Sequence, residues 1–105
     1  MRDFMGMMKQ AAQLQSKMQD MQAELDTIEV EGVAGGGMVS VTLTAKGALK
    51  GVRIDDSLMQ PSEKEIVEDL LVTAHADARR EAEAVLAEKM KAVTGGLPIP
   101  PGLLG

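Results

Sequence analysis

The apolar residues in the first quarter of the chain follow a single helical stripe. Alternating steps of three and four residues place them at Phe4, Met7, Ala11, Leu14, Met18, Met21, Leu25 and Ile28. This heptad spacing predicts a helix with a coiled-coil seam. A helix of about 25 residues is roughly 37 Å long, which is too long and too narrow for a small core within one chain to cover. We expect a second copy of the chain, or the chain's other helix, to cover the seam; packing on the chain's own sheet is the alternative.

The composition also favours association between copies. The only aromatic residue among 105 is Phe4, so the interior must come from Met, Leu, Val, Ile and Ala. A monomer of this size hides only about two-thirds of its surface. Most of the methionines lie near the stripe, where their flexible side chains suit adaptable packing better than cofactor binding. We therefore predict a homodimer seam at Met7, Leu14, Met18 and Met21.

After the helix, the hydrophobic period changes from a helical one to two. Apolar and polar residues alternate over residues 28–31, 39–44 and 49–54, which predicts half-buried strands. Glycines at 35–37 and the Lys46-Gly47 pair mark the two connections, so the strands should form an antiparallel meander. In the third strand we expect Val52 and Ile54 to face the core.

A second and longer helix is predicted after the meander. Ser62 and Glu65 have the spacing of a capping box, and no Pro or Gly follows until Gly95. The apolar first half, residues 66–72, should bury on the sheet. The alanine-rich second half should extend beyond it and suit a partner helix. Residues 97–105 cannot continue the helix. Their leucines invite docking, but a frayed terminus is the more common outcome for such a segment.

These elements define one α+β domain over residues 1–96, with a Pro/Gly/Leu-rich tail at residues 97–105. The absence of cysteine excludes a disulfide scaffold and a Cys-based zinc site, and it favours the cytosol. No apolar run approaches the roughly 20 residues of a membrane span. His75 is the sole histidine, and Asp55-Asp56 suits a turn. We therefore expect no enzyme activity, no metal, no cofactor and no small-molecule substrate.

The charge balance is acidic, but the charges are segregated along the chain. A net charge of −5 taken alone speaks against nucleic-acid binding. The start of the first helix nevertheless carries Arg2, Lys9 and Lys17 against Asp3, and residues 79–91 carry four bases against three acids. Arg2 and Lys9 lie seven residues apart on the outward face of the helix. Such a helix can bury its stripe on a partner while presenting cations to phosphates.

The order of elements and several short motifs resemble the YbaB/EbfC family of bacterial nucleoid-associated proteins. The resemblance covers nearly the whole chain. The matching stretches are Met7-Met8-Lys9-Gln10-Ala11, Val30-Glu31-Gly32, Gly35-Gly36-Gly37, Val39-x-Val41-Thr42, Ile54-Asp55, Ser57-Leu58, Asp77-Ala78, Thr94-Gly95-Gly96-Leu97 and Pro100-Pro101-Gly102-Leu103.

The resemblance implies a homodimer whose sheets join the protomers and whose helices project like tweezers. It also implies a nucleoid protein of the cytoplasm that binds double-stranded DNA and alters its conformation. We expect mainly phosphate contacts, which carry little sequence information, from Arg2, Lys9, Lys17, Arg79, Arg80, Lys89 and Lys91. The alternative is a dimeric module whose seam or tail recruits another protein. A small hydrolase or ligand carrier is a third possibility, for which the sequence offers no constellation of polar residues.

Overall fold

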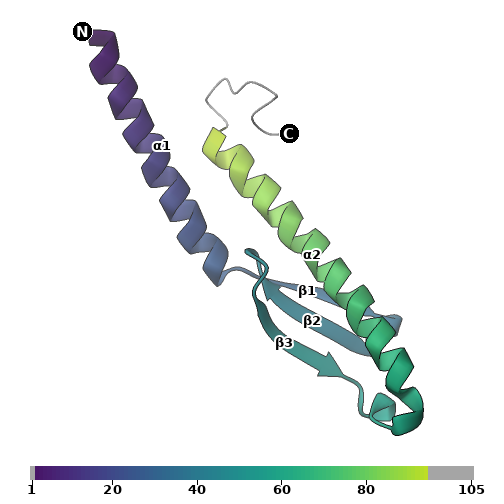
Figure 1. Cartoon of the computed structure of the whole chain (residues 1–105). Helices are drawn as coiled ribbons and strands as arrows, with labels where there is room; N and C mark the ends of the chain where they lie inside the picture. Colours follow the sequence, from purple (N-terminus) through teal and green to yellow (C-terminus); the bar gives the residue numbers. More distant parts are fainter. Residues whose placement is uncertain (1, 95–105) are drawn as a thin grey trace.

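The computed structural model of the chain describes residues 2–94. The sheet has the strand order β1-β2-β3, and both pairs of neighbouring strands are antiparallel. The predicted α+β fold of helix, meander and long helix is thereby confirmed. Figure 1 shows the two long helices running from the sheet toward the same end of the molecule. In chain order the elements are α1 (Arg2–Thr27), β1 (Glu29–Ala34), η1 (Gly35–Gly37), β2 (Val39–Thr44), β3 (Leu49–Ile54), η2 (Asp56–Leu58), η3 (Pro61–Glu63) and α2 (Lys64–Thr94).

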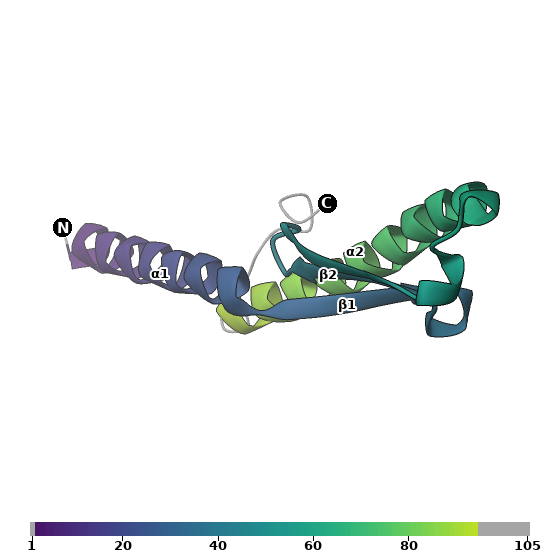
Figure 2. The ribbon, with the colours of Figure 1, turned by 90° about the horizontal axis from the view of Figure 1, so that it is seen from below.

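The apolar stripe of α1 is covered over only part of its length. Met21 and Leu25 are 3% and 2% exposed, and Val85, Met90 and Val93 of α2 are among the side chains around them. Toward the start of α1, Phe4 and Met7 are 66% and 67% exposed. Of the expected covers, the chain's other helix therefore accounts for the second half of the stripe. Figure 2 shows α1 and β1 following one another along the molecule, with α2 behind them.

The main core lies between the sheet and α2. Val39, Val41 and Leu43 of β2 are at most 2% exposed, and they cluster with the fully buried Ala74 and Ala78 of α2. These small side chains let the helix backbone approach the sheet closely. At Gly32 in β1 the approach is so close that a Cβ atom would lie 2.2 Å from the Ala74 carbonyl oxygen. The apolar positions of the alternation predicted for the first two strands thus form the buried face beneath α2.

The expectation that Val52 is a core residue is wrong. Val52 is 43% exposed and only Ile54 of the predicted pair is half-buried. Val52 stands opposite Val41 in the register of β2 and β3, so it is on the predicted face. However, α2 lies over β1 and β2 and leaves this part of β3 without a cover. The position of the helix, rather than the strand pattern, determines the exposure.

Both strand connections follow the turn chemistry predicted from their glycines. Gly35, Gly36 and Gly37 have φ values of 63°, 67° and 93°, in the left-handed region that favours glycine. In the second connection, Gly47 has a φ of 101°, and its N–H donates to the Thr44 carbonyl at 2.8 Å. The next turn also matches its prediction, because the Ser57 hydroxyl donates to the Asp55 carboxylate at 2.7 Å.

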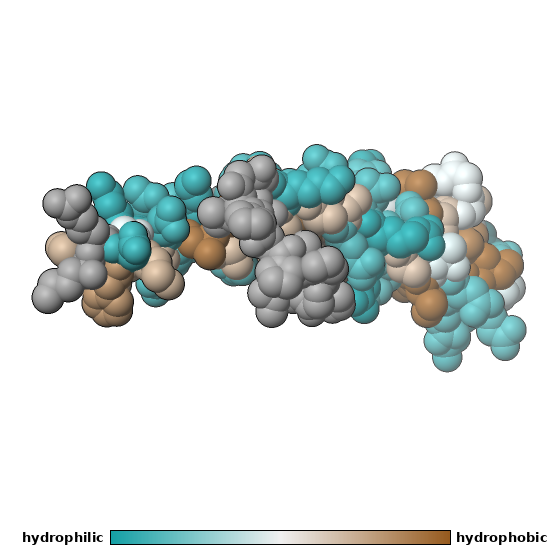
Figure 3. All heavy atoms as spheres, turned by 90° about the horizontal axis from the view of Figure 1, so that it is seen from above, coloured by the Kyte–Doolittle hydropathy of each residue, from teal (hydrophilic) through white to brown (hydrophobic). Residues whose placement is uncertain are grey.

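The start of the long helix differs from its predicted capping box. Gln60 has an extended backbone and its carbonyl accepts the Glu63 N–H at 2.9 Å, which places Ser62 inside the η3 turn. A side chain inside the turn cannot serve as the N-cap, and within the described chain no hydrogen bond joins Ser62 to Glu65. Ile66 and Val72 are also 48% and 71% exposed, so burial of residues 66–72 is incomplete. Apolar residues gather at this end of the molecule in Figure 3.

Candidate nucleic-acid interface

The predicted DNA-binding cations of α1 lie in its first two-thirds, where the helix extends beyond the buried contact of Met21 and Leu25 with α2. Lys9 and Lys17 are exposed, and within the described part of the chain neither forms an ion pair. Seven residues separate Arg2 from Lys9, but the side chain of Arg2 lies outside the described residues. Lys17 also lines a groove between the helices, opposite Lys89 and Val93. These two lysines are therefore free to meet an external anion.

Three of the four predicted cations on α2 are paired with carboxylates of the same chain. Arg79 lies 3.8 Å from Glu83, and Arg80 lies 3.0 Å from an oxygen of Asp77. Lys89 is half-buried and pairs with Glu24 of α1, which joins the two helices. An external phosphate must therefore compete with carboxylates at these three cations. The pairs of Arg79 and Arg80 have the i,i+4 and i,i+3 spacing of neighbours on one helix, whereas the partner of Lys89 does not follow from the sequence.

Lys91 differs from the other three cations of α2. Its side chain is exposed, and it has no ion pair within residues 2–94. Eleven residues separate it from Arg80, which corresponds to three helical turns and about 16 Å. The two cations therefore share one side of α2, and this side is turned away from the buried Ala78 and Ala82. Such a spacing can contact phosphates more than one nucleotide apart.

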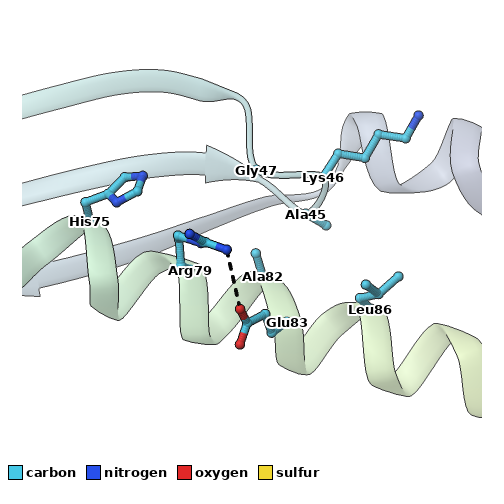
Figure 4. Close-up of a pocket in the computed structure, with 8 residues that line it drawn as sticks. All are labelled: Ala45, Lys46, Gly47, His75, Arg79, Ala82, Glu83 and Leu86. Atoms are coloured by element: carbon cyan, nitrogen blue, oxygen red, sulfur yellow. Dashed lines mark ion pairs between the residues drawn. The ribbon is translucent and has the colours of Figure 1, made fainter. Parts of the chain in front are cut away.

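A groove of about 470 Å³ lies between the second strand connection and α2. Figure 4 shows His75 and Arg79 one turn apart on the helix, with Arg79 directed toward Glu83. Lys46 stands across the groove, but its ammonium points away and pairs with Asp26 at 3.3 Å. His75 is exposed. The groove therefore does not bring the charged groups of Lys46 and Arg79 together, although both residues line it.

Three further cations, which the predicted binding set leaves out, lie around the β3 hairpin. Lys46, Lys50 and Arg53 are all exposed, and a run of three bases without an acid over residues 46–53 was the signal that marked them. Arg53 lines a second groove together with Glu31 and Asp56, so carboxylates weaken its positive field.

The described residues contain no group of three or more His, Cys, Asp or Glu side chains arranged to hold a metal ion. None of their helices combines the length and the apolar character of a membrane span. What the described part of the chain does present is a small sheet from which two helices project with exposed cations. This is the architecture of a small α+β binding protein.

The comparisons identify the family. The sequence profile of the YbaB/EbfC DNA-binding family matches residues 1–97, and the chain belongs to that family. A nucleoid-associated protein of Bradyrhizobium sp. strain ORS 278 is 67% identical over 102 residues, which cover 97% of this chain and 96% of the relative. One from Rhodopseudomonas palustris strain TIE-1 is 64% identical over 103 residues, covering 98% and 97%.

The fold is also found among solved structures. A crystal structure of an uncharacterized protein from Helicobacter pylori matches with a TM-score of 0.68 and 26% sequence identity. The match covers 80% of this chain and 91% of the other. A sequence identity this low beside a common fold indicates that the arrangement of helices and sheet tolerates extensive change in side chains.

Proposed function

We propose that this chain is a nucleoid-associated protein that binds double-stranded DNA mainly through its phosphates and alters the conformation of the DNA. Membership of a DNA-binding family and the names of the relatives support the DNA-binding role. The observation that carries the phosphate contacts is the set of unpaired, exposed lysines on the projecting helices: Lys9, Lys17 and Lys91. Lysine side chains that neutralise phosphates release counterions, which gives affinity without sequence preference.

The proposal places this function in the cytoplasm, on the nucleoid, and it gives no role to catalysis. Because the whole chain carries a net charge of −5, the long-range field of the protein opposes approach to DNA. Local cations must therefore do the binding. Arg79, Arg80 and Lys89 can add contacts where a phosphate displaces their carboxylate partners, and Arg2, by its place in the sequence, adds a positive charge near the start of α1.

The test compares two double variants that remove the same charge. Lys9→Ala with Lys91→Ala should weaken binding to unrelated duplexes and flatten the slope of log affinity against log salt, by about 0.9 for each phosphate that the protein no longer neutralises. Lys50→Ala with Lys64→Ala removes two exposed lysines from outside the projecting region and should leave the slope nearly unchanged. Equal effects of the two pairs would remove the projecting lysines from the interface.

Gel retardation at low salt separates this function from the second candidate, a dimeric module that recruits another protein. The acidic net charge and the exposed stripe at Phe4 and Met7 favour that candidate. Retardation of unrelated duplexes by the full chain supports DNA binding. If no duplex is retarded, and if the full chain captures a protein that a chain ending at Gly96 does not, the function is recruitment of another protein.

We propose further that the protein acts as a homodimer joined at its sheets. β3 pairs only with β2, so its other edge is unpaired, and its side chains Leu49 and Val52 are 61% and 43% exposed. An exposed edge of this kind is a template for strand pairing with another chain. An apolar groove of about 340 Å³ lined by Ile54, Leu58 and Met59 continues this surface.

The structure changes what the predicted dimer seam on α1 can contribute. Met21 is buried and Met18 half-buried against α2, while Leu14 is half-buried and Met7 exposed. A dimer joined at β3 leaves these packing contacts in place and directs both pairs of helices outward. Sedimentation tests it: Val52→Lys should shift the protein toward lone subunits, whereas Met5→Lys, at another exposed apolar position, should not. Dimers that persist in Val52→Lys would contradict the joint at β3.

A further inference from the structure

The first half of the α1 stripe is an apolar surface without a cover in the described structure. Phe4 and Met7 are 66% and 67% exposed, Ala11 is exposed and Leu14 is half-buried. We call these four residues the free seam. The same stripe continues into Met21 and Leu25, which α2 buries. The free seam is therefore the continuation of an interface that already exists within the chain.

The chain itself supplies apolar residues at the point where this interface stops. Val93, one residue before the end of α2, packs near Met21 and lines a groove with Lys17. The sequence then continues through residues 95–105, which carry no charged side chain. Within that stretch the large apolar residues are Leu97, Ile99, Leu103 and Leu104.

We propose that the tail, residues 97–105, docks on the free seam of its own α1. The stripe from Lys17 back to Phe4 spans about 20 Å of helix. The eleven residues that follow α2, residues 95–105, reach about 34 Å in polyproline II conformation. This length lets the tail follow the free seam to its end. Prolines at 98, 100 and 101 prevent α2 from continuing and restrict the free tail, which lowers the entropy that docking costs.

The free seam suits this occupant better than a second α1. Its four residues make up only two heptads, and one of them is Ala11, whereas a coiled coil is indicated by three to four or more heptads. The tail, by contrast, is tethered beside the seam, where a short linker gives it an effective concentration in the millimolar range. Its lack of charge also matches a surface of Phe, Met, Ala and Leu side chains.

Paramagnetic relaxation in solution tests the proposal on the full chain. The sequence contains no cysteine, so a single introduced one carries a nitroxide label at a chosen place. Gln15 and Ser16 are both exposed on α1, but helical geometry places Gln15 beside the seam and Ser16 on the opposite side. With Gln15→Cys, we expect strong broadening of the methyl signals of Leu103 and Leu104. With Ser16→Cys, the broadening should be several-fold weaker.

Mixed samples distinguish docking on the tail's own helix from docking on another copy. If the tail docks on its own helix, the broadening occurs in chains that carry both the spin label and the isotope label. If it appears only between a spin-labelled chain and a separate isotope-labelled chain, the occupant is the tail of a second copy and the proposal fails. Equal and weak broadening from both label positions would likewise overturn it.

Hydrogen exchange provides a second measurement that depends on the tail alone. In Leu103→Ser with Leu104→Ser, the amides of residues 7–14 should exchange faster by several-fold, while those near Leu25 should keep their protection. A matched change outside the tail, Leu49→Ser on exposed β3, should leave residues 7–14 unaffected. Unchanged exchange in the tail variant contradicts docking. Both readouts are made without DNA, so they are independent of the proposed DNA binding.

Discussion

The carboxylate of Asp77 in α2 accepts the backbone N–H of Val33 in β1, with 3.0 Å between Oδ2 and the nitrogen. Its other oxygen is 3.0 Å from a guanidinium nitrogen of Arg80. The side chain therefore ties the long helix to the outer edge strand and orients a predicted DNA-binding arginine. The pKa of Asp77 lies below its ordinary value of 3.8, first because its carboxylate accepts the Val33 N–H and second because it accepts a hydrogen bond from Arg80.

A depressed pKa makes this contact dependent on pH. A carboxylate whose pKa is lower in the folded state than in the unfolded chain stabilises the fold fully above the unfolded value, and it loses that effect as the pH falls through the folded value. We expect Asp77→Asn to lower the melting temperature at pH 7. The difference from the natural chain should shrink once the pH falls below about 3.8.

Thermal melts between pH 7 and pH 3 check this, with Asp69→Asn as the control. Asp69 lies on the same helix and is exposed; its backbone carbonyl accepts the Thr73 hydroxyl, and within residues 2–94 its carboxylate forms no ion pair. If the melting temperature of Asp77→Asn differed from that of the natural chain by the same amount at every pH, the shape of the side chain rather than its charge would account for the effect.

Gly32 should tolerate no side chain. An added Cβ atom would lie 2.2 Å from both the Ala74 carbonyl oxygen and the Ala78 nitrogen, and these backbone atoms cannot swing aside. We expect Gly32→Ala to lower the free energy of unfolding by about 3 kcal/mol, the upper part of the range for overpacking. Gly51→Ala, in a strand position with nothing within 4 Å, should cause no loss in the same urea titration. A stable Gly32→Ala protein would contradict the close packing of α2 on β1.

Releasing Arg79 from its carboxylate should strengthen DNA binding. Glu83 lies 3.8 Å from Arg79, whereas Glu81 has no ion pair within the described structure. Glu83→Gln and Glu81→Gln change the net charge equally, so the comparison isolates the pair. We expect a several-fold gain in affinity for Glu83→Gln and a smaller gain for Glu81→Gln, measured by fluorescence anisotropy at two salt concentrations. Equal gains would indicate that only the overall charge matters.

The joint between the helices should depend on Leu25. This residue is 2% exposed and belongs to the cluster that holds α1 on α2. Truncation of a buried leucine typically costs 2–5 kcal/mol, so we expect Leu25→Ala to lose about 3 kcal/mol. Leu86→Ala, at a position that is 39% exposed, should lose about 1 kcal/mol or less. Denaturant titrations followed by circular dichroism measure both, and equal losses would contradict the core position of Leu25.

The local patterns of the sequence predicted the helices and strands because each of these elements buries one face and exposes the other. The heptad stripe identified α1, and the alternation around Val39 and Val41 identified the buried face of β2. Such patterns do not say which element supplies the cover. Val52 has the pattern of a core residue and remains exposed because α2 lies over the other two strands.

The charges of the candidate site and the ion pairs within α2, at i,i+3 and i,i+4 spacing, could be predicted from the sequence, but the ion pair between the helices could not. The sequence shows that Lys89 and Lys91 lie on the last part of the long helix. Only the fold brings Glu24, 65 residues away from Lys89 along the chain, into contact with it. Lys91, two residues further on, has no ion pair within the described region. The contact between the helices thus decides that Lys89 is paired.

The short joint at Leu25 also makes α1 a lever. Sixteen residues separate Leu25 from Lys9, a distance of about 24 Å along the helix axis. Tilting the rod by roughly 10° at its base would sweep the lysine sideways by about 4 Å, more than the 3.4 Å between successive base pairs. The hydrophobic cluster around Leu25 thus sets the separation between the lysine amines of α1 and α2, and under the proposed function it also sets the width of DNA that they can span.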